Sequence, residues 1–173
     1  MTNKVVVFLI ESSNENDYMY IKSFLDVYYD IKNDKLEKIN LKGKERYNDL
    51  GVIKKIKNIE KKAGSRKLEI VCCLDFDNAI NDHNIKLLNK KIEKYCSQNN
   101  YHLVWFASDI EEVFWGKKVS KNEKKDMAIR FAQNRNRMRI DLDNLRVLKP
   151  RNPKTSNICI VLDKLFTLKD IKD

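Results

Sequence analysis

Acidic side chains follow two strongly hydrophobic runs of the sequence, at the point where each run ends. Glu11 comes directly after residues 4–10 (KVVVFLI), and Asp75 and Asp77 follow residues 68–74 (LEIVCCL). If these runs are strands, Asp75 and Asp77 leave on the same side, because alternate side chains of a strand share a face. Two carboxylates so close repel each other unless a cation lies between them, and hard oxygen ligands suit Mg²⁺ or Mn²⁺. With Glu11 as a third ligand, the pattern predicts a divalent-metal site that can polarise a phosphoryl oxygen and activate water.

A second acidic group follows the run of residues 101–106 (YHLVWF) and consists of Asp109, Glu111 and Glu112. All of these acids also have a purely structural interpretation. Aspartate fills turns after strands, and Glu11, Glu111 and Glu112 suit the first turn of a helix, where the helix dipole favours negative charge. The secondary structure around the acids therefore has to decide between a chemical site and a set of helix caps.

Strand patterns and helix patterns alternate along the first part of the chain. Residues 4–10, 68–74 and 101–106 are apolar runs typical of buried parallel strands, and residues 36–41 have the weaker pattern of an edge strand. Apolar residues at helical spacing fall in three segments between them: residues 18–29, 50–59 and 85–96. This alternation predicts an α/β fold, a single Rossmann-like domain whose mainly parallel sheet of about four strands is flanked by helices. Because parallel strands end at one edge of a sheet, the acids are expected to gather there.

The last third of the chain has a less regular pattern. A helix is predicted over residues 121–134, a basic loop over residues 135–152, and a closing helix over residues 155–168. The inward residues of the closing helix are expected to be Ile158, Val161, Leu162 and Leu165. We therefore expect an α/β core in residues 1–115 and a basic helical and loop extension in residues 116–173 that packs on the same domain.

The formal net charge of +10 is concentrated in two basic blocks. Residues 32–67 hold 13 Lys and Arg against 5 Asp and Glu, and residues 116–154 hold 13 against 4, so the rest of the chain is acidic. Solvated lysine faces of helices explain the first block as well as a binding role does. The second block is rich in arginine, whose guanidinium binds phosphate as a fork, and it indicates nucleic acid as a partner. Its predicted phosphate contacts are Arg135, Arg137, Arg139, Lys149, Arg151 and Lys154.

Several classes of protein are disfavoured by motifs that the sequence lacks. The four glycines form neither G-x-G-x-x-G nor a Walker loop, which disfavours bound NAD, FAD or P-loop ATP. The four cysteines contain no C-x-x-C pair and are expected to be reduced, buried thiols. No apolar run approaches the ~18 residues that span a bilayer, and the N-terminal residues lack the pattern of a signal peptide. We therefore expect a cytoplasmic protein with no membrane partner.

The acidic motifs resemble those of the TOPRIM domain of topoisomerases, primases and related nucleases. The resemblance spans roughly residues 5–115. It is carried by residues 6–11 (VVFLIE), by Glu15 or Asp17 shortly after them, and by residues 72–77 (CCLDFD). It implies that the first glutamate is a general acid or base and a metal-site residue, and that the two aspartates hold a divalent metal. These roles fall on Glu11, Asp75 and Asp77.

Two further stretches are similar to the RloB-like and OLD-like branch of that family, namely residues 107–115 (ASDIEEVFW) and residues 154–158 (KTSNI). Proteins of this branch are associated with phage defence and abortive infection, and several are metal-dependent nucleases. The resemblance implies a catalytic role for Glu111 and a homodimer or larger defence complex as the assembly. One residue departs from the family pattern, because Ser12 stands where a glycine usually follows the first glutamate.

The predicted function is metal-dependent hydrolysis of phosphodiester bonds in DNA or RNA, and two alternatives stay open. The first is a nucleic-acid-binding regulator in which a TOPRIM-like core is only a scaffold. The second is a phosphatase, because residues 71–79 (VCCLDFDNA) and Ser108 resemble the first two motifs of the haloacid-dehalogenase type. In that family Asp75 would be the nucleophile and Asp77 the acid or base, but the motif normally follows the first strand, which it does not do here.

Overall fold

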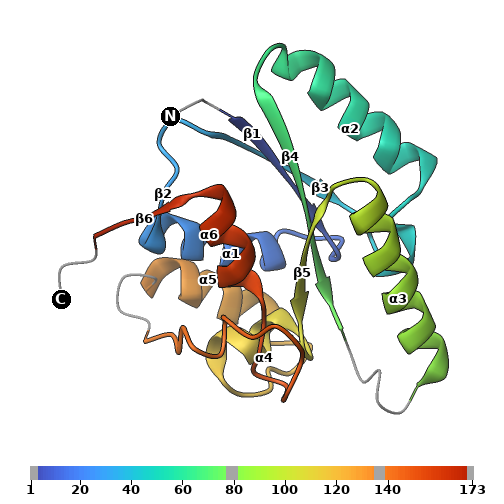
Figure 1. Cartoon of the computed structure of the whole chain (residues 1–173). Helices are drawn as coiled ribbons and strands as arrows, with labels where there is room; N and C mark the ends of the chain where they lie inside the picture. The colour runs from blue at the N-terminus through green and yellow to red at the C-terminus, as the bar shows by residue number, and fades with distance from the viewer. Residues whose placement is uncertain (1–3, 77–81, 135–138, 171–173) are drawn as a thin grey trace. The chain divides into compact units, whose positions relative to one another are not determined.

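The two central strands of the protein form where the sequence is continuously apolar. The structure is a computed structural model that describes residues 4–76, 82–134 and 139–170. Strand β1 (Lys4–Ile10) pairs in parallel with β3 (Lys35–Asn40) and with β4 (Lys67–Asp75), and the sheet order is β3-β1-β4-β5, with β5 at His102–Phe106 (Figure 1). The predicted α/β class with a four-stranded parallel sheet is therefore confirmed. The mixed polar and apolar sequence of β3 places it at an edge, as predicted.

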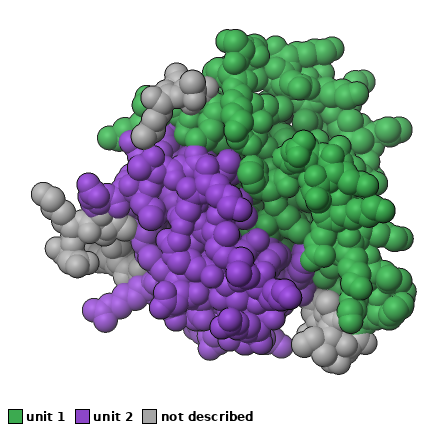
Figure 2. Space-filling view, in the orientation of Figure 1, with its two compact units in different colours: residues 1–13, 32–74, 78–104 green, residues 14–31, 75–77, 105–173 purple. Residues whose placement is uncertain are grey.

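The chain divides into two compact units, whose atoms Figure 2 distinguishes by colour. Unit 1 comprises residues 1–13, 32–74 and 78–104, and unit 2 comprises residues 14–31, 75–77 and 105–173. These units do not follow the predicted boundary at residue 115, since unit 2 takes in an early segment of the chain.

Unit 1 holds most of the sheet and two long helices, α2 (Leu50–Ala63) and α3 (His83–Gln98), together with a short 3-10 turn, η1 (Lys44–Arg46). Both long helices lie on the same side of the sheet (Figure 1), since both line one pocket with the β4 residues Leu68 and Ile70. The buried residues of α3, such as Ile92 and Cys96, face the sheet.

Helix α2 is longer than its prediction. Helical spacing was predicted over residues 50–59, but the helix continues to Ala63, because solvated lysines do not interrupt helical hydrogen bonding. The residues that α2 buries are Val52, Ile56 and Ala63, whereas Leu50 is 85% exposed.

Unit 2 contains helices α1 (Asn16–Tyr28), α4 (Ile110–Trp115), α5 (Lys124–Asn134) and α6 (Ile158–Leu165). Aromatic rings from three of these helices form its core. The ring of Tyr20 stacks on Phe114 with centroids 5.7 Å apart, and it lies 4.9 Å from the ring of Phe131. Edge-to-face and offset contacts of this kind add to the burial of apolar area.

The predicted closing helix over residues 155–168 is correct in its centre and wrong at both ends. Its inward residues, including Ile158 and Leu165, are buried as predicted. The helix starts only at Ile158, because Ser156 is held before it, where its Oγ donates to the Trp105 carbonyl at 2.6 Å. After α6 the chain forms β6 (Thr167–Leu168), which pairs antiparallel with β2 (Tyr29–Asp30).

Two sequence-based expectations concern the environment of the chain. All four cysteines are buried and free of disulfides, which confirms the prediction of reduced thiols. Within the part of the chain that the structure describes, none of the helices combines the length and the hydropathy needed to cross a bilayer.

Candidate functional site

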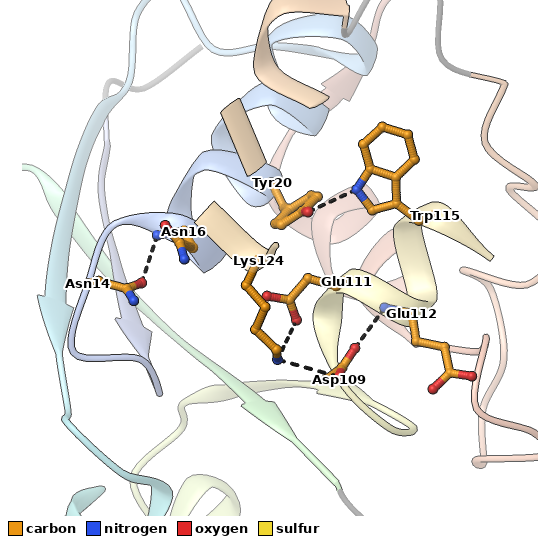
Figure 3. Close-up of polar contacts among 8 residues, drawn as sticks. All are labelled: Asn14, Asn16, Tyr20, Asp109, Glu111, Glu112, Trp115 and Lys124. Carbon is orange, nitrogen blue, oxygen red and sulfur yellow. Dashed lines mark hydrogen bonds and ion pairs between the residues drawn. The ribbon is translucent and has the colours of Figure 1, made fainter. Parts of the chain in front are cut away.

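Three charged side chains of unit 2 meet at the start of α4 (Figure 3). The ammonium of Lys124 lies 2.9 Å from Oε2 of Glu111 and 3.4 Å from Oδ2 of Asp109. The Glu111 side chain is only 2% exposed, while those of Asp109 and Lys124 are 23% and 32% exposed. The cluster is therefore sheltered around Glu111 and open to solvent on its other side.

The helices α4 and α5 set the positions of the two main partners of this ion pair, Glu111 and Lys124. Asp109 is the N-cap of α4, and its Oδ1 accepts from the backbone N–H of Glu112 at 2.7 Å, which orients the first turn that carries Glu111. Lys124 opens α5 on the same face as the buried Ala128 and Phe131, four and seven residues further on. Its ammonium therefore points inward, although the residue belongs to a basic block.

Burial and charge act against each other in this cluster. Burial raises the pKa of Glu111, and the hydrogen bond and charge of Lys124 offset only part of that effect. For Lys124, burial works against the ammonium, but the hydrogen bond and charge of Glu111 outweigh it and raise the pKa. The charges of Asp109 and Asp75 act in the same direction. One lysine thus interacts with three carboxylates. One of these, Asp75, belongs to the pair Asp75 and Asp77 that the sequence predicts as metal ligands.

Two aromatic side chains, the buried Tyr20 and the half-buried Trp115, lie near the cluster (Figure 3). Tyr20 is 0% exposed, and its hydroxyl accepts from Nε1 of Trp115 at 2.9 Å. Burial raises the pKa of Tyr20, and the charge of Glu111 adds to this effect. Tyr20 is therefore a neutral, hydrogen-bonded side chain close to Glu111.

The turn after β1 sets the position of Glu11 within unit 1. The Glu11 carbonyl accepts from the backbone N–H of Gly43 at 2.9 Å, and the Ser12 carbonyl accepts from Nδ2 of Asn40 at 3.1 Å. Gly43 has φ of 126°, a conformation that favours glycine. Ser12 is not among the described residues with positive φ, so the turn does not require glycine at this position.

The predicted site residues are distributed unevenly over the structure. Asp75 and Glu111 both interact with Lys124, and Glu11 lies in the other unit. Asp77, Arg135 and Arg137 lie outside the described residues. The other predicted phosphate contacts are all exposed, as a binding surface requires: Arg139, Lys149, Arg151 and Lys154.

Carboxylate oxygens are suitable ligands for Mg²⁺ or Mn²⁺, but some of the carboxylates in this cluster already bind the ammonium of Lys124. Asp109 and Glu111 are already paired with the ammonium of Lys124 and do not fit a metal site in this arrangement. Among the described residues, no three His, Cys, Asp or Glu side chains form a group that could hold a metal ion. The candidates for metal ligands are therefore Glu11, Asp75 and Asp77, on the chemistry of their side chains.

Two features of this site were not predicted from the sequence. Lys124 was counted only as part of a basic block, although the spacing of Lys124, Ala128 and Phe131 could have indicated an inward lysine. Glu112 was treated with Glu111 as first-turn charge, yet it is 7% exposed, and its Oε2 is buried without a hydrogen-bond partner among the residues that the structure describes.

Comparison with known proteins adds no relative to this picture. The chain matches no family model, and no curated protein or solved structure was found to be significantly similar to it.

Proposed function

We propose that the protein is a metal-dependent nuclease of the TOPRIM type that hydrolyses phosphodiester bonds of DNA or RNA. The observation that carries the proposal is the group of three carboxylates around Lys124, of which Asp75 ends β4 and Asp109 and Glu111 follow β5. Carboxylates at the carboxyl ends of parallel strands are where open α/β sheets place their chemistry. The TOPRIM assignment itself rests on the motif residues of the sequence.

Glu11, Asp75 and Asp77 would hold the Mg²⁺ or Mn²⁺ ion. Glu11 directly follows β1 and Asp75 ends β4, and the motif resemblance gives both of them the role of metal ligands. When bound, the ion would supply Lewis-acid stabilisation of charge on a phosphoryl oxygen.

Glu111 and Lys124 would act on protons and charge beside that ion. A carboxyl group whose pKa is raised by burial releases and accepts a proton closer to neutral pH than an exposed one, which suits a general acid or base. Lys124 keeps a positive charge among the acids, so an anionic phosphate meets less repulsion. Tyr20, which is 0% exposed, lies close enough to Glu111 to interact with its charge.

The exposed basic side chains of the C-terminal segment would bind flanking phosphates: Arg139, Lys149, Arg151 and Lys154. Contacts of this kind position a nucleic acid without reading its sequence. The branch resemblance supports a role in phage defence or abortive infection and a homodimer or larger defence complex as the assembly. The absence of a membrane-spanning run and of a signal-peptide pattern in the sequence supports a cytoplasmic location.

The test is cleavage of single- and double-stranded DNA and RNA in the presence of Mn²⁺, with wild type and Asp75→Asn. The proposal expects at least one substrate to be cut by wild type and cleavage to fall at least ~100-fold in the variant, because a metal ligand is lost. Asp141→Asn removes an exposed aspartate of the same unit and is the matched control. Absence of cleavage in every combination, or equal cleavage by Asp75→Asn, would refute the nuclease.

A non-catalytic nucleic-acid-binding regulator is the second candidate, and Lys124 is the observation that favours it. An internal ammonium compensates buried carboxylates without any metal, which is what a scaffold needs. This candidate expects salt-dependent binding without cleavage. The phosphatase alternative expects turnover of para-nitrophenyl phosphate that Asp75→Asn abolishes.

A further inference from the structure

Unit 1 contains a pocket of about 380 Å³ on the side of the sheet that carries α2 and α3. Its floor is formed by apolar side chains of α2 and β4, including Ile56 and Ile70. Its remaining lining is polar or aromatic and comes from α2, from the end of α3 and from the turn before β5: Lys57, Glu60, Tyr95, Asn99, Asn100 and Tyr101. An apolar floor with a few polar groups around it is the usual composition of a small-molecule site.

The two tyrosines give this pocket its chemical character. The rings of Tyr95 and Tyr101 are in edge-to-face contact, with centroids 5.9 Å apart. The ring of Tyr47, which directly follows η1, contacts Tyr95 with a centroid distance of 5.1 Å. Burial raises the pKa of Tyr101 to about 12, so the Tyr101 side chain is uncharged and its hydroxyl stays protonated. Aromatic side chains are the platforms on which proteins stack unpaired bases.

Amide and carboxylate groups at the rim can pair with the edge of a base. The side chains of Asn99 and Asn100 offer both donors and acceptors, and one of them, Asn99, already donates to the Tyr95 carbonyl at 2.9 Å. Glu60 is an acceptor that suits the exocyclic amino group of a base. Asn100 has φ of 55°, which its short polar side chain tolerates.

The helix beside the pocket presents lysines over its whole solvent face. Five of its residues share that face and are exposed: Lys54, Lys55, Lys57, Lys61 and Lys62. Among the described residues none of these five is in an ion pair, and Glu60 is the single acid of the helix. Helix α3 has a similar row of exposed lysines at four-residue spacing, at Lys86, Lys90 and Lys94. Such rows attract a phosphate backbone by charge, in a salt-dependent way.

The same lysines could attract an acidic membrane, but the geometry of α2 argues against that partner. An interfacial helix buries its apolar face in lipid. Of the apolar residues of α2, Val52, Ile56 and Ala63 are instead buried in the protein. Ile53 and Ile59 are half-buried, and Leu50 at the first position is exposed. A nucleic acid strand can place its phosphates along the lysines of α2 and one base in the pocket, which accounts for both the exposed lysines and the aromatic lining.

We propose that the α2–α3 face of unit 1 binds single-stranded nucleic acid, with backbone phosphates on the α2 lysines and one unstacked base in the pocket lined by Tyr95 and Tyr101. This surface is distinct from the arginine-rich C-terminal segment and needs neither a metal nor cleavage. The proposal therefore stands or falls independently of the nuclease.

The test is fluorescence anisotropy with labelled oligothymidine of ~12 nucleotides, in EDTA so that no cleavage occurs. The comparison ligands are an abasic oligonucleotide of the same length, a duplex of the same length, and anionic vesicles. The proposal expects the base-containing strand to bind about tenfold more tightly than the abasic strand and the duplex, because stacking contributes to only one of them. Tyr101→Leu should remove that difference and leave abasic binding unchanged.

Lysine variants test the other half of the proposal. Lys54→Gln with Lys61→Gln should weaken binding of both single strands about tenfold and lower the salt slope by about 1.4, since two phosphate contacts are lost. Lys118→Gln with Lys164→Gln removes the same charge from exposed positions of unit 2 and should change neither value. Equal binding of base-containing and abasic strands, tighter binding of duplex or vesicles, or equal losses in the two lysine variants would overturn the proposal.

Discussion

The ion pair between Lys124 and Glu111 can be tested by removing one charge at a time. In Lys124→Met the Glu111 carboxylate, in a residue that is 1% exposed, loses its cation, and the remaining neighbour Asp109 repels it. Breaking a buried pair from one side costs about 3–5 kcal/mol, and the 32% exposure of the Lys124 side chain reduces this to about 2 kcal/mol. For a chain of 173 residues, that loss lowers Tm by about 4–8 °C.

The pH dependence of the same variant gives a second readout. Burial raises the folded-state pKa of Glu111, and the loss of Lys124 raises it further. The folded protein then binds this proton more tightly than the unfolded chain does, so the free energy of unfolding increases as pH falls through the folded pKa. The deficit of Lys124→Met relative to wild type should therefore shrink between about pH 7 and about pH 5 in urea denaturation.

Two further variants complete a double-mutant cycle. Glu111→Gln keeps the shape and leaves Lys124 with Asp109, so it should cost only about 1 kcal/mol. The pair Lys124→Met and Glu111→Gln removes both charges and should recover at least about 1 kcal/mol relative to Lys124→Met alone. A single variant within about 0.5 kcal/mol of wild type, or a double variant equal to the sum of its parts, would refute the coupling.

Three other variants test separate parts of the fold. Gly43→Ala should lower the free energy of unfolding by about 1–2 kcal/mol in urea denaturation, because φ of 126° is strained for any residue with a Cβ. Glu69→Gln should weaken the dependence of the free energy of unfolding on pH on the acid side. Burial would raise the Glu69 pKa, but Lys67 and His102 outweigh burial and lower the pKa. The Glu69 carboxylate therefore stabilises the fold above its ordinary pKa of 4.5, and this stabilisation is lost as pH falls through the folded pKa. Leu50→Gln should leave Tm unchanged, because that side chain is 85% exposed; a drop of several degrees would contradict the burial pattern of α2.

The strands were predictable because burial on both faces leaves a direct mark in the sequence. Residues 4–10 and 68–74 are apolar without alternation, and the structure has β1 and β4 there with at most one residue of difference at each end. The helices were predictable in position but not in their ends. Lys61 and Lys62 of α2 look like a loop by composition, yet they lie on the solvent face of a continuous helix.

The rest depended on contacts between residues distant in sequence. The start of α6 is set by Ser156, whose hydroxyl bonds to a carbonyl 51 positions earlier, and a local pattern carries no trace of that bond. The same is true of Lys124, whose partner Glu111 lies 13 positions away in a different helix. Sequence reasoning found the acids of the candidate site but not the cation that compensates them.

The ammonium of Lys124 determines which of these carboxylates are available to a divalent metal. A metal that used the oxygens of Asp109 and Glu111 would have to displace Lys124, whereas one held by Asp75 without these two residues would not. Displacement would leave an ammonium without its 2.9 Å partner, so we predict the second arrangement. Mn²⁺ should then raise the Tm of wild type, since a ligand at about 100 times its Kd adds about 2.7 kcal/mol, and Asp75→Asn should abolish the increase.

Lys124→Met separates the two arrangements. If the metal binds beside the lysine, the variant starts from a lower Tm and shows an increase with Mn²⁺ no larger than that of wild type. If the metal and the ammonium compete for the same oxygens, the variant binds Mn²⁺ more tightly, and its increase exceeds that of wild type. A larger increase in Lys124→Met would therefore reassign Asp109 and Glu111 as metal ligands, and no increase in either protein would contradict a metal site altogether.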